Sequence, residues 1–189
     1  MPVGRPARID RDAVLATGLV IADELGLEAL TMGAVAERLG VTPMALYRHV
    51  VNKADLLDGI VELLLTEFPA PTLEDPWTER LSRLAEAIRA TAQRHPGVFA
   101  LLLQRPATTR AARGARDSVY LALREAGVNE ERVAHTERLI STAILGFAVS
   151  EVAGRFKNHS RRQLDADFER LQGMLAQFID SEVAEGRRA

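Results

Sequence analysis

The sequence contains no cysteine among its 189 residues. This absence excludes disulfide bonds, iron–sulfur clusters held by thiolates and zinc sites built on cysteine. Long apolar runs are also missing, since no stretch approaches the roughly 20 residues that a membrane span requires. Residues 1–8 include basic side chains, but no apolar signal core follows them. We therefore expect a soluble, cytoplasmic protein without a membrane partner.

Motifs of the common enzyme classes are absent as well. The sequence has no G-x-G-x-x-G, no P-loop and no H-E-x-x-H. None of the four histidines follows a glutamate at the Glu-x-x-His spacing that a di-iron helical bundle uses. We predict that the protein is not an enzyme, and we expect neither a cofactor nor a metal.

The residues that are present have the pattern of a helical globular protein. A content of 47% hydrophobic and 26% charged residues is ordinary for a globular chain. Helical spacing of apolar residues and helix caps recur along the chain, and no segment alternates convincingly as a strand would. Three prolines, Pro69, Pro71 and Pro76, mark the clearest break. The sequence predicts an all-α fold with helices at about 11–25, 32–39, 43–50, 53–67, 77–94, 97–103, 107–126, 129–157 and 162–185.

Residues 31–50 have the layout of a helix-turn-helix, with two short helices joined by a turn that contains Gly40. If Leu46 points inward, a rotation of 100° per residue directs Met44 and Arg48 outward, flanked by Ala45 and Tyr47. Residues 38–54 include basic side chains and no carboxylate. Such a face suits the major groove of DNA, where small and apolar groups meet thymine methyls and basic groups meet phosphates.

From the residues alone, two interpretations fit equally well. One is a DNA-binding face, and the other is an ordinary corner between short helices. The second would leave a helical small-molecule-binding or protein-interaction module that does not bind DNA.

The stretch 30–57 resembles the DNA-binding domain of the TetR family of transcriptional repressors, and most closely the Tet repressor subgroup. The most specific part is Leu46-Tyr47-Arg48-His49-Val50-Val51-Asn52-Lys53, followed by a leucine pair. Two departures are Arg48, where the Tet repressor has an aromatic residue, and Met44-Ala45, which replace a Pro-Thr pair. The operator sequence is therefore not transferable.

The resemblance implies a helix-turn-helix DNA-binding domain at residues 1–55 and a helical ligand-binding and dimerisation domain at 56–189. It implies a homodimeric repressor that a small-molecule effector releases from a palindromic DNA operator. The positions that match DNA contacts in the family are Thr31, Thr42, Pro43, Met44, Ala45, Tyr47, Arg48, His49 and Lys53.

The C-terminal region resembles the same family at His95-Pro96-Gly97 and Gln104-Arg105-Pro106. In the Tet repressor, imidazoles hold a magnesium–tetracycline chelate. The matching positions fall near Phe68-Pro69 and at Leu101, where this chain has no histidine. We therefore expect an apolar or aromatic effector in place of magnesium–tetracycline.

Large apolar residues that face the expected bundle interior are candidates for the ligand pocket, although each could instead belong to the core. They are Leu64, Phe68, Ile88, Phe99, Leu103, Tyr120, Leu139 and Phe147. Residues 142–149 are apolar all round, so a helix there must be covered on every side. With apolar residues of the last helix, this segment predicts a dimer interface through the last two long helices.

Overall fold

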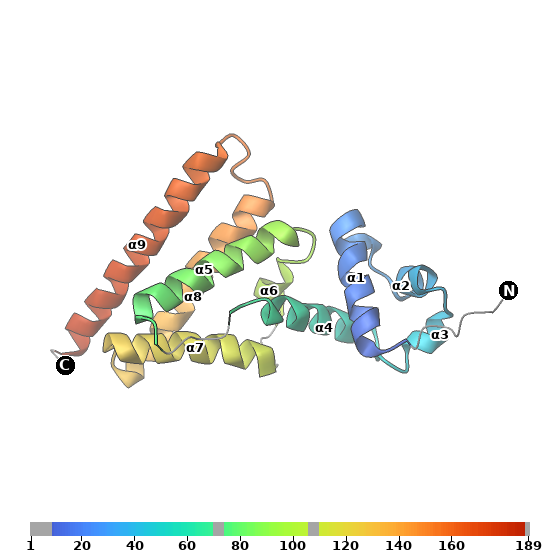
Figure 1. Cartoon of the computed structure of the whole chain (residues 1–189), viewed down its shortest axis with the longest axis horizontal. Coiled ribbons are helices and arrows are strands. Elements are labelled where there is room, and N and C mark those ends of the chain that lie inside the picture. Colours follow the sequence, from blue (N-terminus) through green and yellow to red (C-terminus); the bar gives the residue numbers. More distant parts are fainter. Residues whose placement is uncertain (1–8, 70–73, 106–109, 188–189) are drawn as a thin grey trace.

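The computed structural model describes residues 9–69, 74–105 and 110–187, and within these ranges every regular element is a helix. Helices α1 (Arg11–Leu25), α2 (Met32–Leu39) and α3 (Pro43–Leu46) form one end of the molecule. Helix α4 (Lys53–Thr66) leads from them toward the other helices (Figure 1). The all-α prediction is confirmed. None of the helices in the described ranges is both long and apolar enough to cross a membrane.

Local capping explains where the first helices begin and end. Asp10 accepts a hydrogen bond from the backbone N–H of Ala13, and Thr31 accepts one from that of Ala34. Helix α2 ends at Gly40, whose φ of 68° lies in the left-handed region that glycine tolerates. Asn52 caps α4 in the same way as Asp10 caps α1.

The third helix is shorter than the sequence predicts. It ends at Leu46, and the chain continues as a turn through His49. The N–H groups of His49 and Val50 both donate to the carbonyl of Leu46, at 2.8 and 3.0 Å. This shared acceptor ends the regular α-helical ladder and turns the chain toward α4.

The remaining helices form the larger part of the molecule. They are α5 (Trp77–Arg94), α6 (Leu101–Gln104), α7 (Arg110–Ala126), α8 (Glu130–Val152) and α9 (Arg161–Gly186). Helix α5 agrees with its prediction, whereas the expected helix at 97–103 is a run of turns followed by the short α6. Helix α8 stops before the predicted end at 157, because a turn follows in which Gly154 adopts a φ of 75°. The break predicted from three prolines includes Pro71, which lies outside the described residues.

Two hydrophobic cores organise these elements. The first joins α1–α4 with Val98 and Leu101, and the second joins α5, α7, α8 and α9 with Phe99. Phe68 and Leu102 pack against both cores. Helix α4 contacts α1 on one side and α6 and α7 on the other, so it belongs to both parts of the molecule.

Candidate DNA-binding surface and ligand pocket

The helix-turn-helix presents the outward face that its periodicity predicts. Leu46 and Val35 are fully buried between α2 and α3, and they hold α3 in a fixed rotation. On the opposite side Met44 is 74% exposed and Tyr47 is 50% exposed. Large apolar side chains that are exposed side by side are typical of interaction sites, whereas single exposed ones are common on any surface.

The other residues expected to contact DNA lie on or beside this face. Thr31, Thr42, Pro43, Arg48 and Lys53 are exposed, while Ala45 and His49 are half-buried. We call these nine residues, which exclude the buried Leu46, the recognition surface. The structure thus brings all nine predicted positions to one end of the molecule, with seven of them open to solvent.

An ion pair that the sequence did not indicate fixes the recognition surface. Arg11 on α1 forms two hydrogen bonds to Asp55, of 2.7 and 3.1 Å, and donates a third, of 2.8 Å, to the carbonyl of His49. Asp55 also accepts the N–H of Val51 at 2.7 Å. These contacts tie the segment after α3 to both α1 and α4. No local pattern could predict them, because the partners lie 38 and 44 residues apart in the chain.

Asp55 gives the stability of this region a defined pH dependence. The hydrogen bonds from Arg11 hold the pKa of Asp55 below its ordinary value, with a further contribution from the N–H of Val51. A depressed pKa means that the carboxylate stabilises the fold above the unfolded-state value of about 4, and that this contribution is lost as pH falls through the folded value.

We expect Asp55→Asn to lower the free energy of unfolding at pH 7. The difference from the unmodified protein should shrink below about pH 4. Urea unfolding at several pH values measures it, and a difference that stays constant from pH 7 to 3 would contradict the assignment.

A second set of contacts joins the two parts of the molecule. The ring of His95, just after α5, lies 2.6 Å from Asp23 of α1 through Nδ1 and 2.9 Å from Glu67 at the end of α4 through Nε2. Arg105, just after α6, donates to Asp58 and to the carbonyl of Ala54, both on α4. The two motifs that resemble the C-terminal domain of the family therefore lie where α5 and α6 meet α1 and α4.

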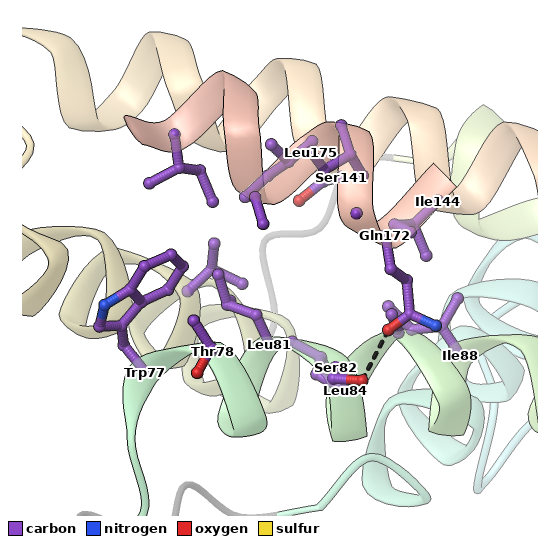
Figure 2. A pocket seen from close by; sticks show the side chains of 16 residues that line it. Trp77, Thr78, Leu81, Ser82, Leu84, Ile88, Ser141, Ile144, Gln172 and Leu175 are labelled. Carbon is purple, nitrogen blue, oxygen red and sulfur yellow. Dashed lines mark hydrogen bonds between the residues drawn. The ribbon is translucent and has the colours of Figure 1, made fainter. Parts of the chain in front are cut away.

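A pocket of about 270 Å³ opens in the second core, bounded by α5, α8 and α9 and by Val119 of α7 (Figure 2). Its polar side chains are Thr78, Ser82, Ser141 and Gln172, together with the indole N–H of Trp77. No ionisable side chain is among the lining residues. Ser82 of α5 donates a hydrogen bond of 2.7 Å to the amide oxygen of Gln172 on α9.

Most of the residues predicted to form the ligand pocket do not line this one. Of the eight, only Ile88 lines it. Leu64 and Phe99 are completely buried in the two cores, and Phe68, Tyr120 and Phe147 are half-buried elsewhere. Leu103 and Leu139 are 48% and 45% exposed and face away from the cores. Helical periodicity identifies which side of a helix is inward, but the space left between α5 and α9 depends on packing that periodicity does not encode.

The apolar residues of α8 and α9, the helices expected to form an interface between subunits, divide into two groups. Ile144, Ala148, Phe168 and Ile179 are buried within one subunit. Leu139 on α8 and Met174 on α9 remain 45% and 61% exposed. At Gly146 of α8, an added Cβ would meet no other atom within 4 Å. The outward sides of α8 and α9 thus expose apolar side chains, and these two helices lie away from α1–α3 (Figure 1).

The chain is similar in sequence and in structure to known DNA-binding regulators. The 28% identical transcriptional repressor DrrR1 of Streptomyces coeruleorubidus aligns over 190 residues, which cover 97% of this chain and 69% of the repressor. The class C tetracycline repressor of Escherichia coli is 39% identical over 85 residues, covering 43% of this chain and 39% of that protein. The crystal structure of BioQ from Mycobacterium smegmatis covers 93% of this chain and 99% of its own, with 28% identity and a TM-score of 0.76. BioQ in complex with its double-stranded DNA operator matches with a TM-score of 0.74 and 28% identity, covering 90% of this chain and 99% of its own.

Two family models match consecutive parts of the chain. The model of bacterial regulatory proteins of the tetR family matches residues 14–60, which include the recognition surface up to Lys53. The model of the tetracyclin repressor-like C-terminal domain matches residues 81–175, or half of the chain. The proteins of this family are transcriptional regulators and not enzymes. The chain belongs to the TetR family of DNA-binding transcriptional regulators.

Proposed function

We propose that this regulator is a homodimeric repressor that binds a palindromic DNA operator in the cytoplasm and leaves it when a small apolar or aromatic effector binds. The observation that carries the proposal is the exposure of Met44 and Tyr47 on a helix whose opposite side is anchored by the buried Leu46. The relatives that are repressors, and BioQ with its operator, support the same docking. The DNA-binding domain at 1–55 and the ligand-binding and dimerisation domain at 56–189 then share α4.

The recognition surface suits a major groove in both shape and charge. Met44 and Ala45 offer apolar contact to thymine methyls, and Arg48 reaches a base edge or a phosphate. Tyr47 and Lys53 are placed to bond phosphates on the rim of the groove. Two such surfaces must lie about 34–36 Å apart to enter successive major grooves on one face of the duplex.

The outward sides of α8 and α9 are the proposed dimer interface. A twofold pair of these helices would bury Leu139 and Met174 from both subunits, and the open position at Gly146 would let the helices approach closely. The interface thus involves residues that one subunit leaves uncovered.

We expect the double variant Leu139→Glu, Met174→Glu to sediment as a monomer. Each glutamate would bury an unpaired charge at a cost of roughly 3–5 kcal/mol, which is enough to dissociate a dimer. Sedimentation velocity measures the outcome. Leu121→Glu, at a 39% exposed leucine on α7, is the matched control and should leave the dimer intact. A double variant that remains dimeric would contradict the proposed interface.

Helix α4 provides the route from effector to DNA. It packs on α1 of the DNA-binding end and on α6 and α7 of the larger part, and Glu67 and Asp58 connect it to His95 and Arg105. An effector acts only by binding the DNA-incompetent arrangement more tightly, and the operator then weakens effector binding by the same factor.

The direct test is a mobility-shift titration of the purified protein with duplex DNA from around its own gene. We expect a specific complex whose affinity falls steeply as salt is added, because phosphate contacts release counterions. A protein that binds no duplex at any salt concentration would instead be a helical ligand-binding or protein-interaction module.

A further inference from the structure

The pocket between α5, α8 and α9 has a chemistry specific enough to name a ligand class. We infer that it binds an uncharged ligand of about two fused aromatic rings that carries a hydrogen-bonding group directed at Gln172. The assignment of this ligand as the effector rests on the proposed function, whereas the binding site itself does not.

The volume of the pocket sets the size of the ligand. A cavity of about 150 Å³ accommodates one benzene ring. The pocket between α5, α8 and α9, at about 270 Å³, has nearly twice that volume. It lies just below the range of roughly 300–1,000 Å³ of sites for drug-sized molecules. Two fused rings fit this space, and a single ring would leave much of it empty.

The lining determines the charge of the ligand. The wall is largely aliphatic, with Leu81, Leu84 and Ile88 from α5 and Ile140 and Ile144 from α8. Because no ionisable side chain lines it, an anionic or cationic ligand would lose its hydration without gaining a counter-charge. Trp77 lies at one end of the pocket, where its indole offers a flat surface to a second aromatic ring (Figure 2).

The polar groups define where the ligand's own polar group must lie. Ser82 donates its proton to the amide oxygen of Gln172, so the Gln172 amide NH₂ is the group through which a ligand acceptor can be bound. Ser141 donates its proton to Glu137 at 2.9 Å, which leaves its hydroxyl oxygen to accept from a ligand donor. A carboxamide on a two-ring ligand supplies both roles, because its oxygen accepts from Gln172 and its NH₂ donates to Ser141.

The location of the pocket indicates how a bound ligand would act. Its walls come from α5, α7, α8 and α9, and none of its lining residues belongs to α4 or α6. A ligand there would contact α5, α8 and α9 together. It would therefore reach the DNA-binding end through α5, which leads to His95, and through the helices of the proposed dimer interface.

Calorimetric titration with two isosteric probes tests the inference without any DNA. The probes are 2-naphthamide, which is neutral, and 2-naphthoate, which has the same shape and a negative charge. We expect 2-naphthamide to bind one site per chain and 2-naphthoate to bind at least about tenfold more weakly, since a buried unpaired carboxylate costs several kcal/mol. Equal affinity for the two probes, or no binding of 2-naphthamide, would overturn the inference.

Two variants place the binding in this pocket. Ala176→Phe fills the space from α9 and should abolish 2-naphthamide binding, whereas Ala184→Phe, at an exposed position of the same helix, should not. Should Ala176→Phe fail to fold by circular dichroism, Gln172→Leu is the second variant, with an expected loss of about tenfold for the carboxamide. Unchanged binding in the folded pocket variants would overturn the site.

Together with the DNA-binding assay, these titrations distinguish a failure of the pocket assignment from a failure of the repressor proposal. If 2-naphthamide binds as expected while the protein binds no duplex, the pocket assignment stands and the repressor proposal fails. If the protein binds its operator and 2-naphthamide does not bind, the repressor proposal stands and the pocket assignment fails.

Discussion

Replacing Tyr47 and Arg48 together with alanine should lower the operator affinity of the dimer by about a thousandfold or more, while leaving the fold and the dimer unchanged. Both side chains are exposed on the recognition surface, so their removal opens no cavity in the core around Leu46. A contact from one such side chain to a base edge or phosphate is worth about 1–3 kcal/mol, and each 1.4 kcal/mol is a factor of ten in affinity. The loss of contacts is doubled in a dimer, because each subunit carries the change.

Fluorescence anisotropy with a labelled operator duplex measures this loss. Arg162→Ala removes the same charged side chain from an exposed position on α9 and serves as the control. The single Tyr47→Ala and Arg48→Ala variants then show how much of the loss in operator affinity each side chain causes. If the double variant binds DNA as tightly as the unmodified protein and circular dichroism shows both folded, α3 is not the helix that enters the groove.

Gly97→Ala should destabilise the protein by about 1–3 kcal/mol and weaken the connection between its two parts. A Cβ at Gly97 would lie 2.2 Å from the carbonyl oxygen of Ala22 and 3.0 Å from its carbonyl carbon. These are backbone atoms at the end of α1, so no rotamer change relieves the contact. Helix α1 would have to move away from the segment after α5, and His95 would lose its short contact with Asp23.

Urea unfolding measures the effect of Gly97→Ala, and Gly114→Ala provides the contrast. At Gly114, inside α7, an added Cβ meets no other atom within 4 Å. Alanine there should raise the free energy of unfolding by roughly 0.5–1 kcal/mol, because glycine is the poorer helix former. Equal effects at the two glycines would show that the close approach of Gly97 to α1 is not part of the native packing.

The sequence predicts well the features that depend on residues close together in the chain. Thr31 and Asn52 cap helices by bonding an N–H three residues on, and the alternation of inward Leu46 with outward Met44 and Arg48 follows from the helix repeat. The outward face with Met44, Ala45, Tyr47 and Arg48 therefore follows from the helix repeat, whereas Thr31, Thr42 and Pro43 join the recognition surface only through the family resemblance. Its role in DNA binding remains a prediction until operator binding is measured.

The features that the sequence does not predict depend on residues far apart in the chain. The hydrogen bond between Ser82 and Gln172 spans 90 residues, and the contact between His95 and Asp23 spans 72. The pocket exists because α5 and α9 leave space between them, a matter of how whole helices pack. Its key residues, Trp77, Ser82 and Gln172, have no local pattern that distinguishes them from other amphipathic helix positions.

Two recognition surfaces, one from each subunit, are expected to enter successive major grooves on one face of the operator. Hydroxyl-radical footprinting of the protein on its operator shows whether they do so. We expect two protected patches of equal strength, centred about 10 base pairs apart and related by twofold symmetry. A single protected patch, or two patches that persist unchanged when Tyr47 and Arg48 are replaced by alanine, would contradict it.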